Sequence, residues 1–227
     1  YGFCFSRNSM NNIIDGFTIK NGGYTLITAY NNSWGNTFQN CVFLTEGTEE
    51  CTYVSYDSGD HFINCTFVGN GNNDVHYDYE TQSVFTNSIF YHFDDFINEN
   101  YLESITVSNS LFYEVDGGLP EGETLIFQDP LFCEPDSGNY HIAGNSPSAG
   151  TGQDGADMGA LGVGCDDIWF PPTIATMADT SMDEDSELML QLSAESSQGY
   201  DIYFEAQSDT SSVHVYTEDD SLHINLE

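Results

Sequence analysis

Basic side chains are almost absent from this chain of 227 residues, which has only Arg7 and Lys20 against 37 aspartates and glutamates. The formal net charge is −35 at pH 7. Nucleic-acid binding needs a basic surface to neutralise phosphates, so this composition excludes it. Binding to an anionic membrane is excluded on the same ground. Such a surface repels itself in dilute buffer and is relieved by salt or by divalent cations.

Proline is absent before Pro120, and no apolar run is long enough to span a membrane as a helix. No stretch within 1–119 repeats apolar residues at helical spacing. Proline cannot donate a backbone hydrogen bond, so its absence here favours strands that are paired on both sides. No signal peptide is present, and Tyr1 begins inside a strand-like run. We therefore expect a segment of a longer, secreted precursor whose leader lies upstream, located extracellularly or at the cell surface.

One four-residue phrase recurs at nearly constant spacing. It consists of Asn, then Cys or Ser, then an aliphatic residue or Thr, then Phe, and successive copies lie 24, 23 and 22 residues apart. A looser copy surrounds Asp15. The asparagines are Asn40, Asn64, Asn87 and Asn109, and the apolar residues two positions earlier are Phe38, Phe62, Phe85 and Val107. A period in the low twenties is typical of a solenoid, in which each structural unit stacks on the next.

Each period contains two runs of alternating aromatic or β-branched and small polar residues, which predict strands. We interpret the first half as a parallel β-coil in which Phe38, Cys41 and Phe43 point inward and stack on their equivalents. The asparagines are expected at sharp left-handed bends, with their amides bonded from coil to coil about 4.8 Å apart. An antiparallel sandwich with a chance period is the alternative.

The repeated Phe-x-Asn-Cys-x-Phe pattern resembles the right-handed parallel β-helix superfamily, which includes pectate lyases, polygalacturonases and many bacterial surface proteins. A following segment strengthens the resemblance, because it is similar to the closing segment of β-helix modules in those surface proteins. Its phrases are Asp129-Pro130-Leu131-Phe132-Cys133, Gly138-Asn139-Tyr140-His141-Ile142, Asn145-Ser146-Pro147 and Asp157-Met158-Gly159-Ala160-Leu161-Gly162. The resemblance implies an all-β chain in which residues 1–167 form a right-handed parallel β-helix with a C-terminal closing segment.

Two of the six cysteines occupy equivalent inward positions of adjacent coils. Cys41 and Cys65 follow the repeated asparagines, and Ser88 and Ser110 take the same place in later coils. A disulfide between in-register parallel neighbours is geometrically awkward. We therefore expect a buried stack of small side chains here.

Two other cysteines, Cys133 and Cys165, bracket the closing segment. We expect a disulfide between them that staples a glycine-rich loop to the body. The pairing of Cys4 and Cys51 is left open. No Cys-x-x-Cys pair is present, so metal ligation by cysteine is not expected.

The pattern changes after Cys165. Residues 166–172 indicate a linker, and four alternating runs with turn residues between them favour an antiparallel β-sandwich over 168–227. The Pro-Pro start and the strand order resemble immunoglobulin-like or cadherin-like repeats of bacterial surface proteins. Only about half of the roughly 100 residues of such a sandwich are present. We expect the missing strands to come from downstream sequence or from another chain.

Acidic clusters are the candidate metal ligands, because carboxylate oxygens suit calcium. No complete Asp-x-Asp-x-Asp-Gly loop is present, and solvated acidic turns or adaptation to salty water explain the same residues. Calcium is therefore a possible cofactor. The candidate calcium ligands are Asp57, Asp60, Asp154, Asp157, Asp166, Asp167, Asp183 and Asp185.

Catalytic patterns of the β-helix superfamily are not found as a group. The only candidate bases of the lyase type, Arg7 and Lys20, both lie in the first coil, and Asp94-Asp95 occurs without the partner motifs of the hydrolases. We expect a non-catalytic structural or adhesive segment of a large modular surface or filament protein. Its partners are then itself, by head-to-tail assembly or strand donation, or a surface polysaccharide. The alternative is a carbohydrate-active enzyme or a polysaccharide-binding module.

Overall fold

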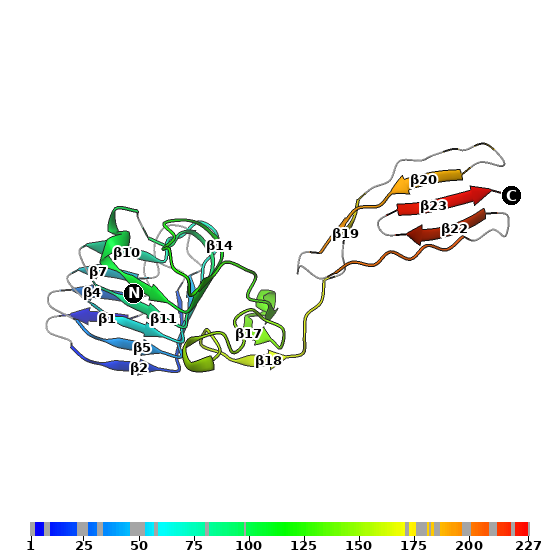
Figure 1. Cartoon of the computed structure of the whole chain (residues 1–227). Helices are drawn as coiled ribbons and strands as arrows, with labels where there is room; N and C mark the ends of the chain where they lie inside the picture. Colours follow the sequence, from blue (N-terminus) through cyan, green and yellow to red (C-terminus); the bar gives the residue numbers. More distant parts are fainter. Residues whose placement is uncertain are drawn as a thin grey trace. The chain divides into compact units, whose positions relative to one another are not determined.

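The computed structural model describes residues 3–6, 10–21, 27–30, 34–45, 53–56, 59–79, 82–97, 99–170, 173–175, 181, 183, 187–196, 201–208, 213–218 and 221–226. The chain divides into two compact units, Tyr1–Ile168 and Trp169–Glu227. The predicted all-β class is confirmed, and the first unit is a parallel β-solenoid (Figure 1). Within the described residues, no helix has the length and apolar character needed to cross a membrane.

Each coil of the solenoid contributes strands to three parallel sheets, which follow one another around the coil. The first sheet contains β1 (Phe3–Ser6), β4 (Ile27–Tyr30), β7 (Tyr53–Tyr56) and β10 (His76–Tyr79). The second contains β2 (Ile13–Asp15), β5 (Thr37–Gln39), β8 (His61–Ile63), β11 (Val84–Thr86) and β13 (Thr106–Ser108). The third contains β3 (Thr18–Asn21), β6 (Val42–Thr45), β9 (Thr66–Val68), β12 (Ile89–Asp95), β14 (Ser110–Gly117) and β15 (Leu125–Ile126).

Phenylalanine rings fill the interior of the coil, as the repeat predicts. In the second sheet Phe38, Phe62 and Phe85 stack with centroid distances of 5.1 and 4.7 Å. A parallel column in the third sheet runs through the final phenylalanine of each repeat, with successive centroids 4.7 to 4.9 Å apart. Its rings belong to Phe43, Phe67, Phe90 and Phe112. Because parallel strands in register place equivalent residues directly above one another, one inward phenylalanine per coil generates a continuous column.

The bend between the second and third sheets is made by the repeated asparagines, which have φ of 47° to 54°. Asparagine tolerates this left-handed conformation better than most residues with a side chain. The predicted bends are thus confirmed. Beside them, the inward Cys/Ser positions form a ladder, in which Ser88 Oγ accepts from the Cys65 N–H and Ser110 Oγ accepts from the Ser88 N–H.

Residues outside the repeated phrases add to the core near the last coils. Leu102 belongs to η1 (Glu99–Ser104), and it packs against the core together with Leu119 and Leu125. The last ring is Phe127, which stacks on Phe112 and is 53% exposed.

The predicted closing segment packs sideways against the solenoid, on the outer face of the third sheet. It contains β16 (Phe132–Glu134), η2 (Pro135–Ser137), β17 (Asn139–Ala143), η3 (Gln153–Gly155) and β18 (Val163–Cys165). Ile89 and Leu111 alternate with the inward phenylalanines and are fully buried against Phe132, Ile142 and Met158. The chain therefore builds a second small core outside the coil.

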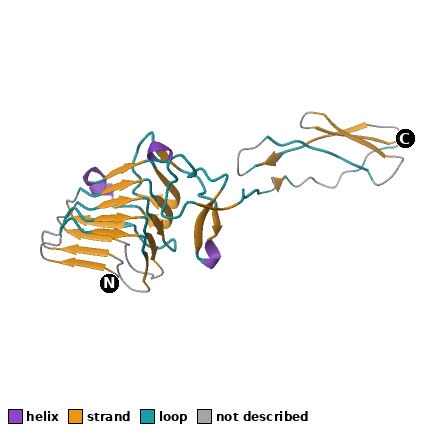
Figure 2. Cartoon of the chain, turned by 90° about the horizontal axis from the view of Figure 1, so that it is seen from below, coloured by secondary structure: helices purple, strands orange, loops and turns teal. Residues whose placement is uncertain are grey.

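The second unit consists of antiparallel sheets, which Figure 2 shows with the rest of the chain coloured by secondary structure. One pairs β19 (Thr173–Ile174) with β21 (Ala194–Glu195). The other has the order β20 (Glu187–Gln191), β23 (Ser221–Leu226), β22 (Val213–Glu218). Antiparallel strands were predicted for this region; their immunoglobulin-like or cadherin-like character stays a prediction.

Candidate binding surfaces of the solenoid

The outer face of the second sheet is a regular surface with mainly polar side chains. Side chains on either side of the buried phenylalanines point outward and form two rows, in which strand register brings hydroxyl, amide and imidazole groups into line. The hydroxyls of Thr86 and Ser108 lie 3.3 Å apart across adjacent strands. His61 and Thr106 are exposed, and the other members from β5 onward are half-exposed. From β2 onward the rows are Ile13, Thr37, His61, Val84, Thr106 and Asp15, Gln39, Ile63, Thr86, Ser108, so three of the ten members are aliphatic.

Asp15 begins one of these rows and is held by amides of the next coil. Its two carboxylate oxygens accept hydrogen bonds of 2.8 Å from Gln39 Nε2 and Asn40 Nδ2. The bond from Asn40 and then that from Gln39 hold the pKa of Asp15 below its usual value. The carboxylate thus stays ionised and engaged, which suits a structural or ligand-orienting role better than a proton-abstracting one.

The predicted asparagine ladder is formed in part. Asn64 Nδ2 donates to Asn40 Oδ1 at 3.4 Å, and Asn40 passes the chain of hydrogen bonds to Asp15. At the next coil the ladder ends, because Asn87 Oδ1 accepts from the Gln153 N–H at 2.7 Å. The equivalent asparagine of the following coil is Asn109, whose backbone N–H donates to Thr124 Oγ1 at 3.0 Å. Docking of the closing segment therefore replaces coil-to-coil bonding at Asn87.

A second polar ladder was not predicted from the sequence. Asn36 Oδ1 accepts from the N–H and Nδ2 of Asn12, and Asp60 Oδ1 accepts from the same two groups of Asn36. Asn36 and Asp60 are fully buried, as is Ser83 at the next equivalent position. All four residues lie two positions before the inward apolar residue of their coil, so the same period contained the signal. Asp60, predicted as a calcium ligand, is in this ladder.

The other candidate calcium ligands are distributed over several places. Asp157 accepts the Gly150 N–H at 2.8 Å and the Val163 N–H at 3.4 Å, so its carboxylate folds a loop of the closing segment. Asp154 has a positive φ of 60° in η3. Asp166, Asp167 and Asp183 are exposed, whereas Asp57 and Asp185 lie outside the described residues. Across the described part of the chain no three metal-ligating side chains come together, and calcium binding stays a prediction.

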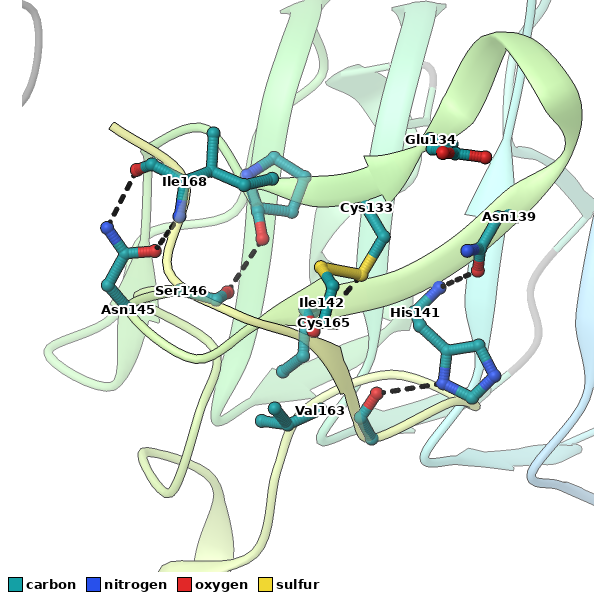
Figure 3. Close-up of a disulfide and its surroundings, with 12 residues drawn as sticks. Cys133, Glu134, Asn139, His141, Ile142, Asn145, Ser146, Val163, Cys165 and Ile168 are labelled. Atoms are coloured by element: carbon teal, nitrogen blue, oxygen red, sulfur yellow. Dashed lines mark hydrogen bonds between the residues drawn. A yellow bond between two sulfur atoms is a disulfide. The ribbon is translucent and has the colours of Figure 1, made fainter. Parts of the chain in front are cut away.

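The predicted disulfide between Cys133 and Cys165 is present, with Cα atoms 6.0 Å apart (Figure 3). It joins β16 to β18 across β17. Nearby, Asn145 exchanges two hydrogen bonds with the backbone of Ile168 and fixes the end of the segment. The disulfide therefore stabilises the closing segment that lies against the third sheet.

Cys41 and Cys65 are buried free thiols, as expected for a stack of small side chains. Burial raises the pKa of both thiols, so they are protonated and unreactive at neutral pH. The side chain of Cys4 and all of Cys51 lie outside the described residues, so their pairing stays open.

A cluster of outward side chains was also not predicted, at the bend within β12 and β14. His92 and Glu114 have positive φ values of 63° and 53°, and they lie at equivalent positions of adjacent coils. Because this conformation interrupts the strict alternation of a strand, Tyr91 and His92 both face outward while Phe93 returns to the core. The same bend places Tyr113 and Glu114 beside them. We call these four residues the tyrosine corner.

Comparison with known proteins adds no identification: no family model matches the chain, and no curated protein matches it.

Proposed function

We propose that this chain is a non-catalytic structural and adhesive segment of a secreted, modular surface protein, and that its solenoid binds a surface polysaccharide. The finer resemblance to the pectate-lyase-like β-helix superfamily of bacteria, with an immunoglobulin-like or cadherin-like repeat after it, is part of this proposal. The observation that carries it is the contrast between two outer faces. The third sheet is covered by the closing segment, whereas the second sheet presents its polar rows to solvent.

The ladder construction supports a presenting role. Phenylalanine columns, the Cys/Ser ladder and the Asn36–Asp60 ladder fix each coil on its neighbour, so the outward side-chain positions repeat at the strand spacing of about 4.8 Å while the groups at them vary. A polysaccharide also repeats along one axis. Preorganised hydroxyl, amide and imidazole groups, with aliphatic side chains between them, can therefore bind successive sugar units with little ordering cost in the protein.

The negative net charge of the chain limits which polysaccharides it can bind. With a formal charge of −35, the chain repels polyanions, and its favoured partners are neutral or amine-bearing glycans. Calcium bound to surface carboxylates would lower this charge and is part of the proposal as a stabilising ion.

The test is retention on immobilised polysaccharides of the whole chain and of two lysine variants. Thr106→Lys places a long side chain on the second-sheet face, and Gln207→Lys places the same side chain on an exposed position of the second unit. We expect retention of the wild type and Gln207→Lys, and at least tenfold weaker retention of Thr106→Lys. Equal retention of both variants, or no retention of any, would overturn the assignment of this face.

A further inference from the structure

The tyrosine corner has the composition of a cation-binding surface rather than of a structural turn. Tyr91 and Tyr113 stack with ring centroids 6.1 Å apart, and the His92 ring lies 5.8 Å from that of Tyr91. His92 packs over Gly71, where a Cβ added to the glycine would come within 2.6 Å of Nε2. The rings are therefore fixed by their neighbours and remain partly exposed.

The closing segment supplies an aromatic wall to this corner. Phe132 meets Tyr91 edge-on at 5.5 Å, and Tyr140 meets Phe132 edge-on at 5.3 Å. Phe132 is buried and so anchors the wall, while Tyr140 is half-exposed. The solenoid and the closing segment thus meet at a surface of three partly exposed tyrosines.

Two carboxylates act on these rings. Burial raises the pKa of Tyr91 and Tyr113, and the negative charges of Glu114 and Asp129 raise it further. Glu114 is exposed, and Asp129 is fixed by accepting the Leu131 N–H at 2.8 Å. Lys20 is in register with Tyr91 but three strands away on the third sheet, at about 4.8 Å per strand. Within the described part of the cluster, the charged groups are therefore the carboxylates of Glu114 and Asp129, and the imidazole of His92 is the group that can take up a proton.

We propose that Tyr91, Tyr113 and Glu114 bind the protonated amine unit of an amine-bearing saccharide, with Tyr140 and Asp129 completing the site. This inference rests on the proposed saccharide-binding function and names its ligand class. Tyrosine faces attract cations through their π-electrons and also stack on the C–H face of a sugar ring. The carboxylates attract the ammonium group and repel uronic acids.

The test is an NMR titration of the whole chain in 0.15 M salt at pH 6, following the His92 ring signals assigned with His92→Asn. The probes are a glucosamine disaccharide, its N-acetylated form and a uronic-acid disaccharide. Glu114→Gln removes one charge at the corner, and Glu121→Gln removes the same charge at another exposed position. We expect saturable His92 shifts with the amine sugar alone, weakened about threefold to fivefold by Glu114→Gln and unchanged by Glu121→Gln.

Three results would overturn the inference: no His92 shift, equal affinity for the amine and N-acetylated sugars, or equal weakening by both glutamine variants, which would indicate diffuse charge. In each case the polysaccharide-retention assay with Thr106→Lys separates the two proposals. If Thr106→Lys still weakens retention, the proposed function stands although the amine site is rejected. If neither a His92 shift nor retention that depends on the second-sheet face is seen, both proposals are rejected.

Discussion

Replacing Phe67 by alanine should remove much of the stability of the solenoid, because this ring is fully buried in the middle of its column. It stacks on Phe43 at 4.7 Å and on Phe90 at 4.9 Å. It also meets Phe62 and Phe85 edge-on, at 5.6 and 6.0 Å. A buried Phe→Ala change costs about 3–5 kcal/mol, and four lost aromatic contacts place this one near the upper end, at about 4–5 kcal/mol.

The matched control is Phe127→Ala at the end of the same column. Phe127 is 53% exposed and, among the described rings, stacks on Phe112 alone, at 5.7 Å, so its loss should cost about 1 kcal/mol. Urea unfolding is followed by Trp34 fluorescence in a Trp169→Phe background, because the two tryptophans belong to different units. A Phe67→Ala loss below about 1 kcal/mol, or equal losses for the two variants, would refute the continuous-column argument.

Four further outcomes follow from the described contacts. Asn87→Gly keeps the left-handed bend but loses the acceptor of the Gln153 N–H, and should cost about 1 kcal/mol in urea unfolding, with Asn87→Ala costing more. Reducing the Cys133–Cys165 bond, which spans 32 residues, should cost about 3–4 kcal/mol in the same assay; no change would mean that packing alone holds the segment. Burial and then the charges of two neighbouring aspartates raise the pKa of Asp74 in the folded chain. The folded state therefore loses stability as pH rises from the ordinary pKa of an aspartate to this raised pKa. Asp74→Asn should therefore stabilise the chain at pH 7 by less than about 1 kcal/mol, with the gain vanishing below pH 4, and a loss at pH 7 would contradict this. Millimolar calcium should raise the thermal unfolding midpoint above that of a sodium control at matched ionic strength, whereas equal midpoints would reduce the acidic clusters to solvated turns.

The repeat made the solenoid predictable because each coil obeys the same local rule. An inward Phe38 and a left-handed Asn40 define one bend. Because the strands pair in register, the equivalent residues form the same bend in the next coil. The buried ladder through Asn36 has the same period and was equally available in the sequence. The disulfide was predictable from the position of its cysteines around one glycine-rich segment.

The docking of the closing segment was not predictable from local pattern. It depends on Gln153 and Ala160 bonding to residues 66 and 94 positions earlier, and on Gly159 approaching the third sheet where a Cβ would meet the Ile89 side chain. The tyrosine corner was hidden for another reason. Its bends use His92 and Glu114 at positive φ, where no glycine or asparagine marks a turn in the sequence.

The central claim is that this chain binds a saccharide without transforming it. The most direct measurement incubates the whole chain with the polysaccharide that it retains, then determines the bound fraction and the chain length and unsaturation of the recovered glycan by mass spectrometry. The account predicts bound glycan recovered with unchanged length and no new double bonds. Shortened or unsaturated oligosaccharides would contradict it in favour of a hydrolase or lyase, and a complete lack of binding would contradict the adhesive role.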